Sequence, residues 1–334
     1  MKLDFTEVQK TKLELLKCQE MISNLLRSDL FYSNDYIDEQ PEKIAVYSTT
    51  ANTFDFLRPS LKSLYFNSDV DKVILITDTD DIPEDFPKEL EVITLKEPPN
   101  FLIEDGPNLH SKYTYFCLLR VGLHRLFPQY NKILSLDYDT IIRKDICDLW
   151  NNNLGNRYYV GGVMETKRTK GTVYGYNPFD SFLAMSSVQF SRVNYVNAGV
   201  LLLNLKKLRD DGAGDEMIDF INEQEFLLPE QDIFNRVCHR SMLLLSNEYN
   251  SNRFSEELID PKIIHYAGKE KKLDWPDVKP YAEMSWSRVK YRRETRYKKP
   301  LTIKEEKDED KEIKPVKNDI SLEELAKNTK EVEP

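Results

Sequence analysis

The stretch Lys-Ile-Leu-Ser-Leu-Asp-Tyr-Asp, from Lys132 to Asp139, decides how this chain can fold. Its apolar run, Ile133 to Leu136, predicts a buried strand. Asp137 and Asp139 follow this strand directly, and both carboxylates can turn toward one point where the backbone leaves the sheet. Paired oxygen ligands suit Mn²⁺ or Mg²⁺, and such an ion with open positions can bind a diphosphate. In an open α/β sheet, ligands bind at the carboxyl ends of the strands, which is where this pair lies.

The Asp-x-Asp tripeptide alone does not establish a metal site. Two solvated acids at a polar strand end would explain the same residues equally well. The elements that flank the tripeptide are therefore needed to choose between these interpretations.

Strands and helices alternate on the N-terminal side of the two aspartates. Strands are expected at 44–48, 73–77 and 90–95, and helices at 56–66 and 113–127. Pro59 is compatible with the first of these helices because it falls in the first turn. This alternation predicts an α/β fold with a mostly parallel sheet and helices on both of its faces.

The C-terminal side continues with further apolar strands and amphipathic helices. Residues 140–142 are apolar; strands are expected at 158–164, 196–204, 241–245 and 262–265, and helices at 146–150, 216–225 and 231–238. Neither a Gly-x-Gly-x-x-Gly nor a Gly-Lys-Ser/Thr phosphate loop is present, so we expect phosphate to be bound through a metal. The long irregular segment 167–193 is interpreted either as a lid or acceptor-binding segment, or as a surface excursion.

Composition limits the classes of function. The 334 residues suffice for one large α/β domain or two ordinary ones, and the net charge of −10 argues against a nucleic-acid partner. No run of about 18 apolar residues predicts a membrane span, and no signal peptide is recognised, which favours a cytoplasmic protein. The four scattered cysteines predict reduced thiols rather than a zinc site.

Four regions are expected along the chain. Residues 1–42 predict a helical extension, 43–280 the main domain, 281–300 a basic aromatic segment and 301–334 a charged, disordered tail. The segment 286–299 interleaves cations with aromatic side chains, which indicates either peripheral contact with an anionic membrane or a solvated basic helix. The N-terminal helix packs on the main domain or on a partner, which leaves the oligomeric state open.

Four separated pieces of sequence resemble one family. They are Lys132–Thr140 with Asp148-Leu-Trp150, Val196–Lys207 with its Asn-Ala-Gly core, Pro229–Asn235, and His265-x-x-Gly268-x-x-Lys271. Together and in this order they resemble the retaining glycosyltransferase family 8, which contains glycogenin and bacterial lipopolysaccharide galactosyl- and glucosyltransferases. The similarity covers roughly residues 43–275. It implies a GT-A fold, a Rossmann-like domain that binds a nucleotide-sugar through Mn²⁺.

The resemblance implies roles for individual residues. The metal would be held by Asp137, Asp139 and His265. The nucleotide-sugar would contact Ser48, Thr49, Thr50, Asn52, Arg120, Tyr138, Ala198, Gly268 and Lys271, with Lys271 on the diphosphate. The chain departs from the family pattern at three places. Many relatives carry an acidic residue where this chain has Thr50 and Ala51, Glu230 replaces the usual Asp before Gln231, and Trp275 lacks the usual preceding proline.

The residues expected nearest the chemistry are Asn197, Gln231, Asp232 and Glu165. Asn197 and Gln231 match positions that line the donor sugar, and Glu165 an acidic position near the donor–acceptor junction. Gln231 is neutral, so we favour same-face attack in which the leaving phosphate takes the acceptor proton. Asp232 and Glu165 would be the nucleophiles if a covalent intermediate forms.

The resemblance implies a Mn²⁺- or Mg²⁺-dependent retaining hexosyltransferase. It would move galactose or glucose from UDP-galactose or UDP-glucose to a glycan or glycolipid acceptor. A glycogenin-like self-glucosylating primer is an alternative, but no tyrosine follows the Asn-Ala-Gly motif before Tyr249. The other alternative is a non-catalytic protein that binds nucleotide-sugars.

Overall fold

The computed structural model describes residues 42–109, 113–166, 168–169, 172–173, 195–255, 258–268 and 271–296. The expected N-terminal extension, most of the segment 167–193 and the charged tail lie outside these residues.

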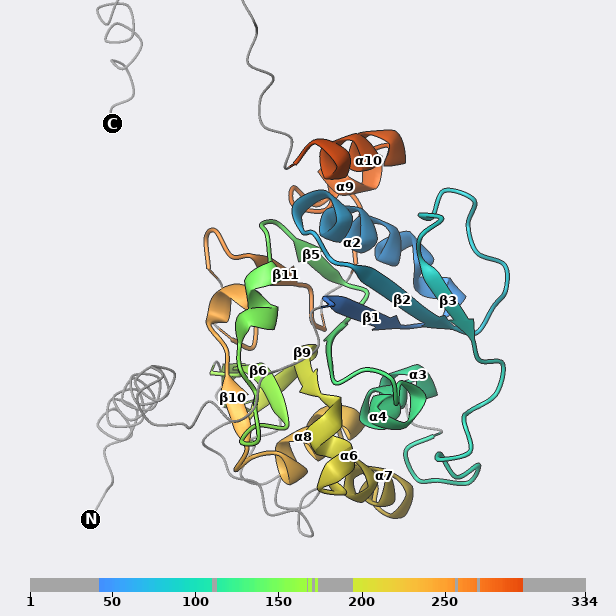
Figure 1. Ribbon diagram of the computed structural model, residues 1–334, viewed down its shortest axis with the longest axis vertical. Coiled ribbons are helices and arrows are strands. Elements are labelled where there is room, and N and C mark those ends of the chain that lie inside the picture. Colours follow the sequence, from blue (N-terminus) through green and yellow to red (C-terminus); the bar gives the residue numbers. More distant parts are fainter. Residues whose placement is uncertain are drawn as a thin grey trace, which may run out of the picture. The chain divides into compact units, whose positions relative to one another are not determined.

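A seven-stranded sheet in the order β10-β6-β9-β4-β1-β2-β3 forms the centre of the fold (Figure 1). Its strands are β1 (Ile44–Ser48), β2 (Lys72–Thr77), β3 (Glu91–Thr94), β4 (Lys132–Leu136), β6 (Val160–Met164), β9 (Val196–Asn204) and β10 (Met242–Leu244). Within this sheet β9 is antiparallel to both of its neighbours, and the other pairs are parallel. The predicted mostly parallel α/β sheet is therefore confirmed.

Helices cover both faces of this sheet, because the side chains of β1 alternate between two apolar cores. Ile44 and Val46 face one core, and Ala45 and Tyr47 face the other. Figure 1 shows two groups of helices on opposite sides. One group is α2 (Phe54–Asn67), α9 (Lys279–Glu283) and α10 (Trp286–Thr295), and the other is α3 (Tyr115–Leu118), α4 (Leu123–Leu126), α6 (Leu205–Asp210), α7 (Ala213–Glu223) and α8 (Pro229–Val237).

Smaller elements complete the described fold. They are the antiparallel pair β5 (Thr140–Ile142) and β11 (Ile263–His265), the hairpin β7 (Arg168–Thr169) and β8 (Thr172–Val173), and the 3-10 turns η1 (Ala51–Thr53), η2 (Leu119–Gly122), η3 (Cys147–Asn151) and η4 (Asn247–Tyr249).

Three helix predictions need correction. Helix α2 begins at Phe54, so Pro59 lies inside the helix rather than in its first turn. The fully buried Leu57 and Leu61 fix the helix on the sheet and outweigh the loss of one backbone hydrogen bond. The helix expected at 113–127 is divided into α3, η2 and α4, and the break ends at Gly122, against which the ring of Phe101 packs. The helix expected at 146–150 is the 3-10 turn η3.

Successive strands add to the sheet on opposite sides of β1, and this change of side creates a crevice that can hold a ligand. Strands β2 and β3 extend the sheet on one side of β1, whereas β4 lies on the other side. Tyr47 pairs with Leu136, so β1 and β4 end side by side. The loops that follow these two strands therefore open onto one crevice, as is usual at such a switch point.

Within the basic aromatic segment, Trp286–Thr295 form α10, which packs on α2. Val289 is buried, and the Trp286 ring meets the edge of Tyr65 at 6.0 Å between centroids. Arg293 donates to the Val70 carbonyl at 2.9 Å and pairs with Glu89 at 3.4 Å. Much of this segment is therefore occupied with contacts inside the fold. None of the helices among the described residues is long and apolar enough to cross a bilayer.

Candidate active site

Three side chains of types that can ligate a metal meet where β4 ends. Asp137 and Asp139 lie on the turn after β4, and His265 is the last residue of β11. The Nε2 atom of His265 lies 3.4 Å from Asp137 Oδ2 and 3.2 Å from Asp139 Oδ1. In the part of the chain that the structure describes, this is the one group of three such residues whose ligand atoms all lie within 4.8 Å of one another.

Backbone pairing explains how the distant His265 reaches the two aspartates. Strand β11 pairs with β5 so that His265 lies opposite Thr140, one residue beyond Asp139. The imidazole also packs on the backbone of Gly199, where an added Cβ would lie 2.0 Å from the ring. Glycine in the Asn-Ala-Gly motif therefore provides the space for this ligand.

Cations surround the two carboxylates. Arg120 is buried, pairs with Asp137 and lies 3.5 Å from Glu230, while Lys271 Nζ lies 2.6 Å from Asp139 Oδ2. Burial alone would raise the pKa of Asp137, but Arg120 and His265 outweigh it and hold that pKa well below its usual range. His265 and Lys271 likewise outweigh burial and lower the pKa of Asp139. Both aspartates are therefore ionised near neutral pH, as a metal ligand must be.

The aspartates also change the protonation of His265. Burial opposes the charged imidazolium, but Asp139 and Asp137 outweigh it and raise the pKa of His265 to about 9. Without a metal the ring is therefore protonated at neutral pH. Two carboxylates and one imidazole form a donor set that fits Mn²⁺ or Mg²⁺, with the imidazole favouring Mn²⁺.

Beside the triad lies a network of amides and acids. Asn197 Nδ2 donates to Glu165 at 2.9 Å and to Gln231 at 3.2 Å. Gln231 Oε1 accepts from the backbone N–H of Ala198, and Gln231 Nε2 donates to Glu165 and to the Tyr195 hydroxyl, both at 3.2 Å. The network fixes which end of each amide faces the cavity.

Glu165 is the least satisfied member of this network. Its Oε2 atom is buried and has no hydrogen-bond partner among the described residues. Burial raises the pKa of Glu165 to about 7, although hydrogen bonds from Asn197 and Gln231 oppose this shift.

The cavity over these groups has a volume of about 420 Å³ and collects the predicted residues. It is lined by Ser48, Thr49, Thr50, Asn52, Arg120, Asp137, Tyr138, Asp139, Glu165, Asn197, Ala198, Gln231, His265, Gly268 and Lys271. Sequence reasoning gave Gly199 a close-approach role and matched Glu230 to a family position, but it assigned no role to the lining residues Thr53, Tyr113, Thr114, Cys117, Leu228, Phe254 and Ala267. Most of these lie within or next to a recognised motif, and this position in the sequence is the signal that could have identified them.

Asp232 is the predicted site residue that the structure places outside the cavity lining. Its two carboxylate oxygens accept hydrogen bonds from the Tyr195 hydroxyl at 2.6 Å and from the Leu228 N–H at 3.0 Å. Because α8 turns Gln231 toward the cavity, its neighbour Asp232 points behind it. These contacts favour a structural role for Asp232, and its role as a nucleophile stays a prediction.

Two departures from the family pattern also have a structural explanation. The backbone N–H of Ala51 donates to Asp78 at 2.8 Å, so an acidic side chain reaches this loop from the end of β2. Trp275 stacks on Tyr266 with ring centroids 4.5 Å apart and does not line the cavity.

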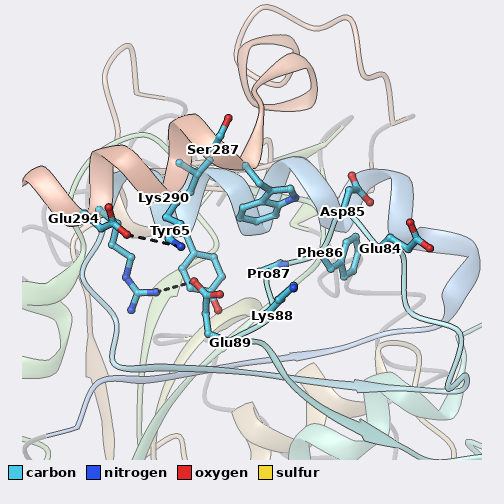
Figure 2. Close-up of a pocket in the computed structure, with 13 residues that line it drawn as sticks. Tyr65, Glu84, Asp85, Phe86, Pro87, Lys88, Glu89, Ser287, Lys290 and Glu294 are labelled. Atoms are coloured by element: carbon cyan, nitrogen blue, oxygen red, sulfur yellow. Dashed lines mark hydrogen bonds and ion pairs between the residues drawn. The ribbon is translucent and has the colours of Figure 1, made fainter.

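A second hollow, of about 630 Å³, lies between α10 and the loop 84–89 (Figure 2). Its rim mixes both signs of charge, and Lys290 lies 3.9 Å from Glu294, one turn along α10. No three metal ligands converge among the described residues there. The first cavity is therefore the better candidate for chemistry.

Comparison with known proteins agrees with this geometry. The family model for glycosyl transferase family 8 matches residues 45–275. A Haemophilus influenzae protein whose name describes it as a glycosyltransferase is 25% identical over 183 residues, covering 50% of this chain and 52% of that protein. General stress protein A of Bacillus subtilis is 23% identical over 261 residues, covering 69% of this chain and 86% of that protein.

Solved structures share the fold at low sequence identity. The WbbM bifunctional glycosyltransferase has a TM-score of 0.56 at 16% identity, covering 78% of this chain and 52% of its own. The galactosyltransferase LgtC has a TM-score of 0.53 at 16% identity, covering 72% of this chain and 95% of its own. The chain thus spans about half the length of the Haemophilus protein and of WbbM. The match over most of its own length, together with the GT-A architecture, establishes that the chain belongs to glycosyltransferase family 8.

Proposed function

We propose that this protein is a metal-dependent retaining hexosyltransferase that moves galactose or glucose from a UDP-sugar to a glycan or glycolipid acceptor. The observation that carries the proposal is the convergence of Asp137, Asp139 and His265 beside Lys271 in one cavity. Two ionised carboxylates at the bottom of a crevice favour a divalent cation, and a cation there favours a diphosphate.

The residues around the triad would bind and orient the leaving group. A bound Mn²⁺ or Mg²⁺ would supply Lewis acidity to the diphosphate as its bond to the sugar breaks. Lys271 would exchange its contact with Asp139 for a phosphate oxygen. Gly268, at a φ of +60°, holds a backbone turn at the cavity edge that other residues rarely adopt. Ser48, Thr49, Thr50 and Asn52 line the end of the cavity proposed for the nucleoside.

The amide network would hold the donor sugar on the other side of the metal. Asn197 and Gln231 present neutral polar groups, which favours same-face attack, in which the leaving phosphate takes the proton of the acceptor hydroxyl. Glu165 is the carboxylate in the lining that would serve a covalent route, and its unpartnered Oε2 also suits a hydrogen bond to a sugar hydroxyl.

The first experiment is UDP release from a panel of UDP-sugars, with Mn²⁺ or with EDTA. We expect slow hydrolysis of one UDP-hexose that requires metal and is lost in Asp139→Ala. Asp145→Ala is the matched control, because Asp145 is an exposed aspartate outside the cavity. Its activity should equal that of the wild type.

Other outcomes would favour the alternatives. Metal-dependent UDP binding without turnover of any donor, even with glycan acceptors added, would favour a non-catalytic nucleotide-sugar-binding protein. Glucose attached covalently to the protein itself would favour a glycogenin-like primer. Absence of UDP binding in the presence of Mn²⁺ would overturn the proposal.

A further inference from the structure

Asn250 lies between the metal triad and the amide network, although it does not line the cavity. It is fully buried just after η4. Its Oδ1 atom lies 3.0 Å from His265 Nδ1, and its Nδ2 atom donates to Asn197 Oδ1 at 3.0 Å. One side chain thus contacts both a proposed metal ligand and a proposed sugar-binding residue.

The hydrogen bonds of Asn197 determine which end of the Asn250 amide faces it. Asn197 Oδ1 accepts the backbone N–H of Gly199 at 3.0 Å, and Asn197 Nδ2 donates to the carboxylate of Glu165. A backbone N–H can only donate, so Asn197 Oδ1 must point toward it. Asn250 must therefore present its own Nδ2 to Asn197, and its Oδ1 to the opposite side.

A second backbone anchor gives the same orientation. Asn252 Oδ1 accepts the backbone N–H groups of Phe254 at 2.8 Å and Ser255 at 3.1 Å. Asn252 Nδ2 must then donate, and it reaches Asn250 Oδ1 at 2.9 Å. Both anchors leave Asn250 Oδ1 as an acceptor facing His265.

We infer that Asn250 is a positioning residue that keeps the proton of His265 on Nδ1, so that Nε2 is directed at Asp137 and Asp139 as a metal ligand. Hydrogen bonds of this kind fix the tautomer and orientation of a ligating imidazole and typically change metal affinity by about 10–100-fold. Through its hydrogen bond to Asn197, the same side chain also helps to fix the residue proposed to bind the donor sugar. This inference rests on the proposed metal role of the triad.

The test measures Mn²⁺ binding alone, by electron paramagnetic resonance of the free ion, with no sugar donor present. We expect Asn250→Ala to weaken Mn²⁺ binding by about 10–100-fold. The matched control is Asn108→Ala, because Asn108 is also buried and uses both ends of its amide, on Ile221, Gln224 and Phe226. That variant should lose thermal stability and keep the Mn²⁺ affinity of the wild type.

A spectroscopic readout separates positioning from a general loss of structure. The chain contains four histidines, so nitrogen-15 NMR can follow each ring. In the metal-free wild type, at a pH where His265 is neutral, we expect the Nδ1-protonated tautomer. In Asn250→Ala we expect a mixture of tautomers or the other form.

Asn250→Asp keeps the acceptor for His265 and places an oxygen against Asn197 Oδ1. We expect this variant to retain Mn²⁺ binding and the Nδ1 tautomer, while donor hydrolysis falls. Equal Mn²⁺ affinities in the wild type and Asn250→Ala, or equal losses in the two Asn250 variants, would overturn the inference. A wild type that does not bind Mn²⁺ would instead overturn the proposed function, so the two failures are distinguishable.

Discussion

The free-energy cost of burying an ionisable side chain in the cavity depends on pH. Glu165 is the clearest case, because burial raises its pKa from 4.5 to about 7. The folded state therefore holds this proton more tightly than the unfolded chain, and stability falls as pH rises between these two values. The cavity keeps this carboxyl despite the cost, which is typical of functional groups.

Glu165→Gln should remove this cost. The free energy of unfolding of the variant minus that of the wild type should grow by up to about 3 kcal/mol as the pH rises from about 5 to about 8. Chemical denaturation at both pH values measures the difference. Glu225→Gln, at an exposed glutamate, should show no such change. A pH-independent difference for Glu165→Gln would contradict the buried-carboxyl interpretation.

The raised pKa of His265 predicts how metal binding depends on pH. Because its pKa is raised to about 9, a metal ion must displace a proton from the ring at neutral pH. Mn²⁺ affinity should therefore rise about tenfold for each pH unit up to about pH 9 and then level off. Titrations of the wild type at several pH values measure this slope, and a flat profile between about pH 6 and about pH 8 would refute the prediction.

Sequence motifs picked out most of the residues that the structure brings together in one cavity. Asp137, Asp139 and His265 converge because strand-end carboxylates and a histidine after a short strand are strong signals. Asn250 could not be found in this way, because its role depends on which side chains the fold places around it. The same limit applies to Asp232, whose position next to Gln231 in sequence does not reveal that it stays outside the cavity lining.

Among the elements, β9 imposes the strictest steric requirement, since the imidazole of His265 lies on Gly199. Gly199→Ala would place a Cβ 2.0 Å from that ring. We expect loss of Mn²⁺ binding and a destabilisation of about 1–3 kcal/mol, typical of overpacking in a well-packed interior. Calorimetry and Mn²⁺ titration measure the two effects.

Gly161→Ala is the matched control for this prediction. Gly161 lies on the neighbouring strand β6, and its added Cβ would come no closer than 3.4 Å to another atom. It should retain metal binding. If both alanine variants bind Mn²⁺ like the wild type, the close packing of His265 on Gly199 does not determine Mn²⁺ binding.

Periodicity located the strands well, but it could not give their direction. The run Val196–Asn204 is buried throughout, as parallel central strands usually are, yet β9 is antiparallel to both neighbours. Direction depends on the path of the connecting segments, which local pattern does not contain. Likewise, Pro59 predicted an early helix position, and core packing of α2 overrode that preference.

For the molecule as a whole, α10 has two candidate roles. Several of its cations hold it on the domain, whereas Arg288, Lys290 and Tyr291 are exposed. Contact of 286–299 with an anionic membrane stays a proposal, and deletion of the helix would test it poorly because deletion would also uncover Tyr65. Charge reversal at exposed positions avoids that problem.

Arg288→Glu combined with Lys290→Glu should reduce sedimentation with anionic vesicles several-fold if α10 lies on the membrane surface, because each cation contributes about 1 kcal/mol there. The melting temperature should stay close to that of the wild type, since neither residue is buried. Arg293→Glu is the contrasting variant and should lower the melting temperature by breaking the pair with Glu89. Unchanged sedimentation of the double variant would leave α10 with the structural role alone.

The pairing of β11 with β5 has a consequence for how the protein is made. Asp137 and Asp139 leave the ribosome early, whereas His265 follows only after most of the domain has been synthesised. A nascent chain can therefore build the first strands of the sheet long before it can hold an ion at full strength. With the proposed metal role of the triad, full-strength binding would follow only after β11 has been synthesised, and a chain truncated before β11 should bind Mn²⁺ more weakly than the whole chain.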